Sequence, residues 1–144
     1  MNEKLRKVII ETTPKRKIFK NMIKAFLIGG LICAIAEIIN FGILYFFDIE
    51  KDIANIYTVI IMIFLGAFST GLGLYDRLGQ VAGCGTIIPI TGFANSMTSS
   101  ALESKSEGLI LGIITNVFKL AGSVIVTGVL CGVIIGTIRY LVGI

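Results

Sequence analysis

Long apolar runs separated by short polar turns dominate the hydropathy pattern of the chain. Residues 25–47 contain only Glu37 and Asn40 as strongly polar residues, and residues 53–74 contain no charged residue. About 20 apolar residues are enough to cross a bilayer as a helix. We therefore expect two membrane-spanning helices, joined by a short acidic turn at residues 48–52.

The next apolar segment, residues 78–103, does not have the pattern of a continuous lipid-facing helix. Its first half contains Gly83, Gly85 and Pro89, and its second half is rich in Ser, Thr and Asn. Irregular backbone at membrane depth is tolerated only inside protein or beside a water-filled cavity. We expect a discontinuous or re-entrant element that breaks between Gly83 and Pro89 and continues as a helix capped by Thr91.

Two segments carry a polar face at helical spacing. On residues 92–103 the polar side chains share one arc, which contains Asn95, Ser96, Ser99, Ser100 and Glu103. On residues 108–141 a narrower arc contains Asn116, Lys119, Ser123 and Thr127. Lipid would leave both faces poorly solvated, so we expect them to turn toward one water-accessible cavity.

The last stretch also carries a face of small residues, nearly opposite its polar face. Gly128, Gly132 and Gly136 form a doubled GxxxG pattern. Small residues at this spacing let membrane helices approach closely, so this face is expected to pack against another helix. Residues 108–141 are too long for a perpendicular span, so we expect this segment to tilt, to overhang the membrane or to kink, with a kink expected near Gly122.

Composition supports a membrane protein and excludes two other classes. The chain has 144 residues, of which 55% are hydrophobic and 15% charged, and its mean hydropathy is +0.92. Soluble domains carry about 25% charged residues, and disordered chains have far lower apolar content. We predict an all-α polytopic integral membrane protein with about four membrane segments. It is expected to form one transmembrane domain, residues 25–144, after a tail at residues 1–24.

The charge distribution predicts the orientation. Residues 1–24 contain eight basic and two acidic side chains, whereas the rest of the chain has a small negative balance. Because basic segments beside a span stay cytoplasmic, next to anionic lipid, the tail is expected inside and the turn at residues 48–52 outside. The basic run has no interleaved aromatic residues, and no nucleic-acid partner is expected.

The sequence contains no enzyme signature. Histidine is absent, and the cysteines, Cys33, Cys84 and Cys131, form no CxxC pair. We found no Walker sequence, no complete dinucleotide fingerprint and no GxSxG elbow. We therefore expect no catalytic residue, no metal site and no cofactor.

Charged residues inside apolar stretches are the candidates for function. Glu37 and Lys119 lie near the middles of such stretches, where an unpaired charge is costly. They either line a polar route or pair with each other to fix helix register. Asp76 and Arg77 lie near the expected membrane interface. They act there either as anchors or as part of a gate. Backbone N–H groups at residues 83–91 are a further candidate for binding carboxylates.

Three motifs resemble the SpoVA spore membrane proteins, most closely the AC-type members. These are GLYDRLGQ at residues 73–80, GCGTIIPITGFANSMTSSALESKSEG at residues 83–108 and NVFKLAG at residues 116–122. AE-type members share a shorter version of the second motif. The resemblance extends from about residue 24 to the C-terminus.

The resemblance implies a subunit of a gated channel in the spore inner membrane. Such a channel moves dipicolinic acid, with calcium, into the forespore during sporulation and out during germination. Implied partners are other SpoVA subunits, including a soluble dipicolinate-binding subunit and an AE-type membrane subunit, and homo-oligomer formation stays open. The alternative is a non-conducting scaffold that positions a pore formed by other SpoVA proteins. A channel would use as solute contacts Lys119, Asn116, Ser123, Thr127, Asn95, Ser99, Glu103, Arg77, Asp76 and Glu37.

Overall fold

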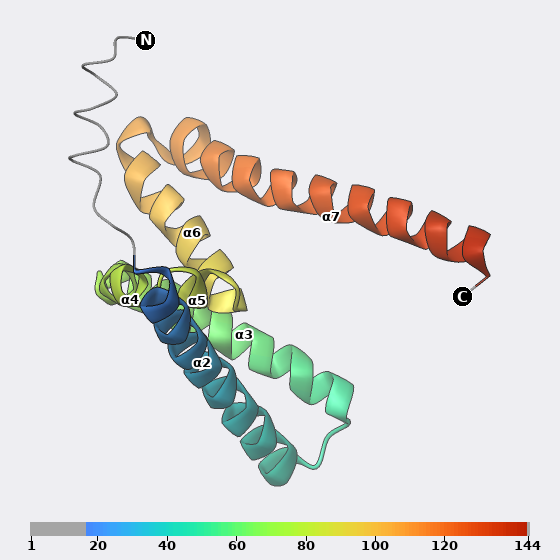
Figure 1. The fold of residues 1–144 in the computed structure, drawn as a ribbon. Coiled ribbons are helices and arrows are strands. Elements are labelled where there is room, and N and C mark those ends of the chain that lie inside the picture. Colours follow the sequence, from blue (N-terminus) through green and yellow to red (C-terminus); the bar gives the residue numbers. More distant parts are fainter. Residues whose placement is uncertain (1–16, 144) are drawn as a thin grey trace.

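The computed structural model describes residues 17–143, and this part of the chain contains helices and no strand (Figure 1). The elements are α2 (Ile18–Phe47), α3 (Lys51–Gly71), α4 (Leu74–Ala82), α5 (Cys84–Ile87), α6 (Ile90–Glu103), a 3₁₀ turn η1 (Ser104–Glu107), a π-helical turn η2 (Leu109–Ile114) and α7 (Thr115–Val142). Three helical stretches are long and apolar enough to cross a membrane: Ile18–Phe47, Lys51–Gly71 and Leu109–Val142. The predicted all-α polytopic membrane class is confirmed.

Helices α2 and α3 form an antiparallel hairpin with buried polar side chains between them. The turn between them places Asp48 in the left-handed region, at a φ of 45°. The buried Asn40 amide donates to Asn55 Oδ1 at 2.8 Å and to Thr58 Oγ1 at 3.1 Å. In an apolar environment such bonds cannot be exchanged for bonds to water, so they fix the register of the two helices.

The segment after α3 breaks where the sequence predicts. Gly83 has a φ of 53° and separates α4 from α5, and Pro89 stands at the N-cap of α6. The expectation that Thr91 caps this helix is wrong, because α6 already begins at Ile90. Thr91 lies inside the first turn, with its hydroxyl 2.7 Å from Tyr75 Oη, and so ties α6 to α4.

The segment that contains α4, α5 and α6 packs first along α2, through α5, and then along α3, through α6. Gly85 packs directly against the backbone of Ala25, near the start of α2. Pro89 shares a cleft with Glu37, which lies farther along α2. Helix α6 then packs along α3, where Gly66 lies against the first turns of α6. The entry and exit of the segment therefore lie toward the end of the α2–α3 hairpin that is opposite the Asp48 turn.

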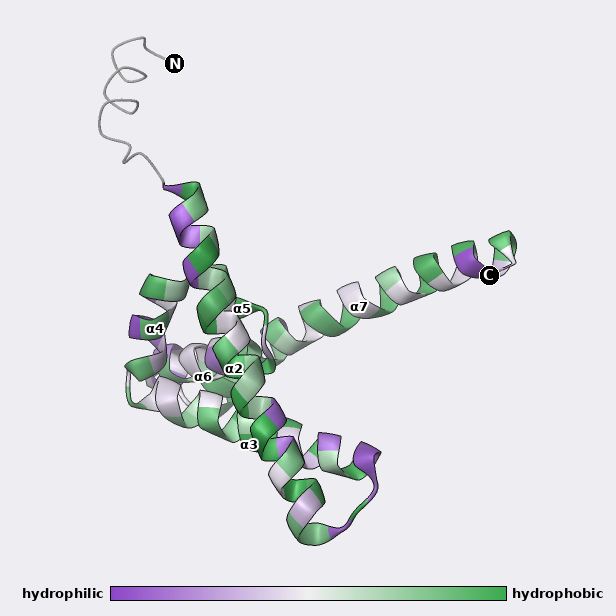
Figure 2. Ribbon diagram, turned by 60° about the horizontal axis from the view of Figure 1, so that its bottom comes forward, coloured by the Kyte–Doolittle hydropathy of each residue, from purple (hydrophilic) through white to green (hydrophobic). Residues whose placement is uncertain are grey.

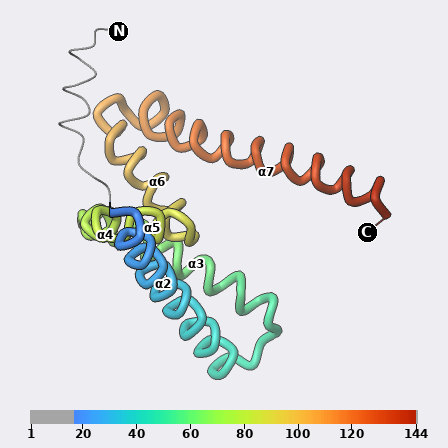
Figure 3. The backbone as a smooth tube through the Cα atoms, in the orientation of Figure 1, coloured from blue at the N-terminus to red at the C-terminus, as the bar shows by residue number. Residues whose placement is uncertain are grey.

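Helix α7 leaves this body and extends away from it (Figures 1 and 3). The expected kink near Gly122 is absent, because α7 runs unbroken from Thr115 to Val142. The irregular backbone lies earlier, in η2, where Gly112 packs against the Ser104 carbonyl and leaves no room for a side chain. Gly122 has no neighbour that would force a bend.

The surface along the long helices is mainly hydrophobic. Figure 2 shows hydrophilic residues at the first turns of α2, on α4 and around the α2–α3 turn, and hydrophobic residues along much of α7. None of the most apolar part of α7 is buried within the chain. This distribution is typical of helices whose sides contact lipid or neighbouring subunits.

Candidate solute-contacting cleft

A polar cleft of about 520 Å³ lies between α6 and the first part of α7. Its walls are formed by Ser96, Ser99, Ser100 and Glu103 of α6 and by Asn116, Lys119, Leu120 and Ser123 of α7. Both walls consist of positions three or four residues apart, which share one face of a helix. The cleft therefore brings together the two polar faces found in the sequence. We call it the α6–α7 cleft.

The short connection between the helices forms this cleft. Gly108 has a φ of 94°, which lets the chain turn between η1 and η2. Gly112 packs against the carbonyl of Ser104, and the Asn116 amide donates to the Gly112 carbonyl at 3.0 Å. These contacts fold α7 back against α6, so that Lys119 faces the serine-rich side of α6.

The cleft has one cationic and one anionic group on opposite walls. The side chains of Lys119 and Glu103 are exposed, and neither forms a hydrogen bond or an ion pair within residues 17–143. The Ser123 hydroxyl donates to its own helix, to the Leu120 carbonyl at 2.8 Å. The lysine ammonium is therefore free to attract an anion, and the glutamate is free to attract a cation or to repel the anion.

Two of the predicted solute contacts lie on the same helices but outside the cleft. Asn95 faces α3, where its Oδ1 accepts from the Thr70 hydroxyl at 2.8 Å. Thr127 lies one turn beyond Ser123 and donates to the Ser123 carbonyl at 2.8 Å. The structure therefore gives Asn95 a packing contact between α3 and α6.

The remaining candidates do not line this cleft. Glu37 lines a separate cleft of about 380 Å³ between α2 and α3, beside Asn40 and Asn55. Asp76 and Arg77 lie exposed on α4. Glu37 and Lys119 thus lie in different clefts, and the chain does not bring them together as a pair.

The glycine stripe of α7 has no partner within the described residues. A Cβ added at Gly128, Gly132 or Gly136 would meet nothing within 4 Å. The predicted packing therefore has no counterpart inside residues 17–143, and it remains a prediction about contacts with another molecule.

Two polar contacts that hold the helices together could not be foreseen from the sequence, and both lie outside the cleft. The first is the amide of Asn40 between α2 and α3. The second is the buried hydroxyl of Tyr75, which donates to the Thr86 carbonyl at 2.8 Å and contacts Thr91. The only signal was a polar residue inside an apolar stretch, and the partner across the helix interface could not be read from spacing.

Comparisons with known proteins identify the family of the chain. A family model of SpoVAC/SpoVAEB sporulation membrane proteins matches residues 21–138. Stage V sporulation protein AC of Bacillus subtilis (strain 168) is 53% identical over 127 residues, which cover 88% of this chain and 85% of that protein. No solved structure matches the chain. The chain therefore belongs to the SpoVAC/SpoVAEB family of sporulation membrane proteins.

Proposed function

We propose that this chain is a subunit of a gated channel in the spore inner membrane, which moves dipicolinic acid with calcium into the forespore during sporulation and out during germination. The α6–α7 cleft is part of its solute path. The observation that carries the proposal is the unpaired Lys119 ammonium facing hydroxyl groups and one unpaired carboxylate. Membership of a family of sporulation membrane proteins supports a role in a membrane during sporulation and an association with other SpoVA proteins.

In this proposal the chain crosses the membrane three times and re-enters once. The basic tail of residues 1–24 lies in the cytoplasm, α2 and α3 cross out and back, and the chain from α4 to α6 re-enters from the cytoplasmic side. The contact of Gly85 with Ala25 near the start of α2 and the position of Pro89 beside Glu37 support re-entry. Helix α7 then crosses outward.

The charges on α7 support this last crossing. Lys119 and Arg139 are the charged residues of α7, and they lie 20 positions apart. On an α-helix this separation is about 30 Å, the thickness of the hydrocarbon core of a bilayer. Lys119 is then near the cytoplasmic interface and Arg139 near the outer one, so the α6–α7 cleft forms a cytoplasmic entrance.

The chemistry of the cleft suits dipicolinate accompanied by calcium. Lys119 attracts one carboxylate of the solute, and the serine hydroxyls of α6 offer hydrogen bonds to it. Glu103 supplies an oxygen of the kind that calcium prefers. Because the facing charges cancel, a calcium–dipicolinate pair is attracted without being held tightly, and conduction requires such weak binding.

The α7 helix favours a second candidate, a scaffold that does not conduct. Beyond the cleft, α7 is exposed along its whole length and its glycine stripe faces nothing in the chain. A helix of this kind is available to contact neighbouring subunits, and a scaffold would use it to hold a pore formed by them.

Reconstitution separates the channel from the scaffold. The full chain is inserted into liposomes loaded with dipicolinate and calcium, and released dipicolinate is measured by the luminescence of external terbium. A channel gives release above that of protein-free liposomes, in response to membrane tension. Full insertion with no release under tension would contradict conduction by this chain and favour the scaffold.

A further inference from the structure

Another cleft, of about 710 Å³, lies at the start of α2, away from the α6–α7 cleft. We call it the amino-terminal cleft. Its walls come from the first two turns of α2 and from the α4–α5 junction. They contain Ile18, Asn21, Met22, Lys24, Ala25, Gln80, Val81, Ala82, Gly83 and Cys84. The solute path proposed above uses none of these residues.

The cleft combines a cation and amide groups with an apolar wall. Lys24 is half-buried, and its ammonium has no hydrogen-bond or ion-pair partner among the described residues. The side chains of Asn21 and Gln80 line the same cleft. Two large apolar side chains on its walls, Met22 and Val81, remain 59% and 53% exposed. A ligand that fits these walls has an anionic, hydrogen-bonding part and an apolar part.

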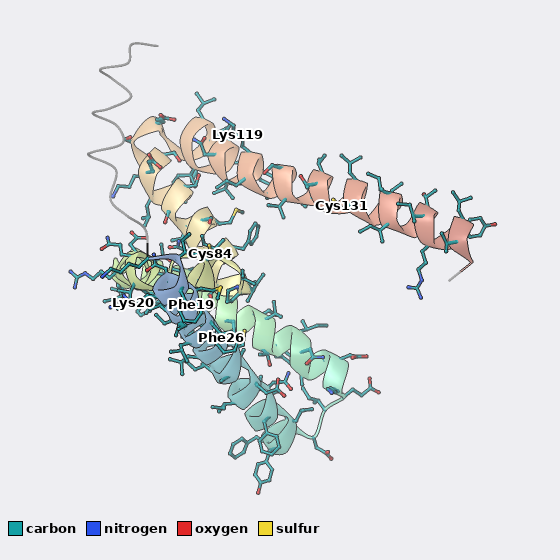
Figure 4. The ribbon with its side chains drawn as sticks, viewed as in Figure 1. Phe19, Lys20, Phe26, Cys84, Lys119 and Cys131 are labelled. Atoms are coloured by element: carbon teal, nitrogen blue, oxygen red, sulfur yellow. The ribbon has the colours of Figure 1, made fainter. Side chains whose placement is uncertain are left out.

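The surroundings of the cleft are typical of a membrane interface. Lys17, Lys20 and Lys24 lie within eight residues, and no acidic residue lies among them. Figure 4 shows Lys20 at the first turn of α2, with Cys84 on the adjacent α5. Anionic lipids of the cytoplasmic leaflet attract basic segments of this kind.

Helix α4 also has the pattern of a segment at the membrane interface. Its apolar residues Leu74, Leu78 and Val81 are exposed and share one face, Asp76 lies opposite that face, and Arg77 lies at its edge. A short helix with one exposed apolar face and one charged face lies in the plane of the interface, with the apolar face toward the acyl chains. The cleft therefore opens where lipid headgroups meet acyl chains.

We propose that the amino-terminal cleft binds an anionic phospholipid. Lys24 pairs with the phosphate, and the amides of Asn21 and Gln80 donate hydrogen bonds to phosphate or glycerol oxygens. Met22 and Val81 contact the first carbons of the acyl chains. The bound lipid bridges α2 and the α4–α5 junction.

Native mass spectrometry of the full chain in detergent, titrated with phosphatidylglycerol, tests this site. Replacing Lys24 with glutamine (K24Q) removes one charge and is expected to weaken phosphatidylglycerol binding about fivefold. Replacing Val81 with serine (V81S) is also expected to weaken binding, because an apolar contact is lost. The matched control K51Q removes a lysine from the far end of the α2–α3 hairpin and should leave binding unchanged.

Four outcomes would overturn the proposal. Equal binding by wild type and K24Q would show that Lys24 does not contact the lipid. Equal weakening in K24Q and K51Q would indicate charge attraction without a site. Displacement of the lipid by glycerol phosphate at the lipid's own concentration would indicate a site for a free anion. A change of oligomeric mass in K24Q with lipid binding intact would also contradict it, since the cleft would then be a subunit interface.

Discussion

Lys119→Met is the substitution that bears most directly on the chemistry of the α6–α7 cleft. Methionine keeps a long flexible side chain and removes the charge. Because the lysine is exposed and forms no bond within the described residues, its loss breaks no contact that holds the fold. We expect normal insertion and assembly together with reduced dipicolinate flux.

The expected loss of dipicolinate flux depends on how exposed the Lys119 ammonium is. Two unit charges 4 Å apart attract by about 1 kcal/mol in water and by about 4 kcal/mol at an effective dielectric constant of 20. For an exposed lysine at the wall of an open cleft, the attraction for a carboxylate lies toward the lower of these values, at about 1–2 kcal/mol. The flux of dipicolinate should therefore fall about 5- to 30-fold. Higher salt should reduce the difference, because it screens exposed charges.

The assay is terbium-detected release from liposomes that contain equal amounts of inserted protein. Lys105→Met is the matched control, because Lys105 is an exposed lysine of η1 outside the cleft. Lys119→Arg should retain more flux than Lys119→Met. Glu103→Gln should raise the flux of calcium-free dipicolinate, because it removes repulsion. Normal flux through Lys119→Met would refute the role of the lysine.

Three further substitutions test the topology and the packing. A cysteine at Lys51, in a background without the native cysteines, should react with an impermeant thiol reagent added outside, and labelling only from inside would reverse the topology. Gly85→Ala should lower the thermal unfolding temperature in detergent, because a Cβ at this position collides with the Ala25 backbone. Such overpacking costs about 1–3 kcal/mol of folding stability. Gly42→Ala is the control, because a Cβ at Gly42 meets nothing within 4 Å. Gly132→Leu should abolish copurification with partner subunits while the chain still inserts, and intact complexes would show that this face contacts lipid.

Much of the α6–α7 cleft could be predicted because helical spacing determines which side chains share a face. Ser99 and Glu103 lie four positions apart, as do Asn116 and Leu120, and a short connection is enough to oppose the two faces. The break in the third apolar segment was equally visible, because Gly83 and Pro89 mark it directly in the sequence.

Features that depend on contacts between helices could not be predicted from spacing. Asn95 lies on the polar arc of α6, yet it faces Thr70 because α6 packs along α3. Thr91 has the chemistry of a cap, but Pro89 already starts the helix and the hydroxyl contacts Tyr75. Gly112 of the π-helical turn lies close to the Ser104 carbonyl, and only the folded chain shows this contact.

In the proposed channel, dipicolinate passes through the α6–α7 cleft. The most direct measurement is the release of dipicolinate from liposomes containing Ser99→Cys in a cysteine-free background, before and after reaction with a bulky thiol reagent. Ser99 lines the cleft, whereas Thr137, the control position for cysteine, lies exposed near the end of α7. We predict that modification at residue 99 blocks release, that dipicolinate slows this modification, and that modification at residue 137 leaves release unchanged. Undiminished release from fully modified Ser99→Cys protein would contradict the account.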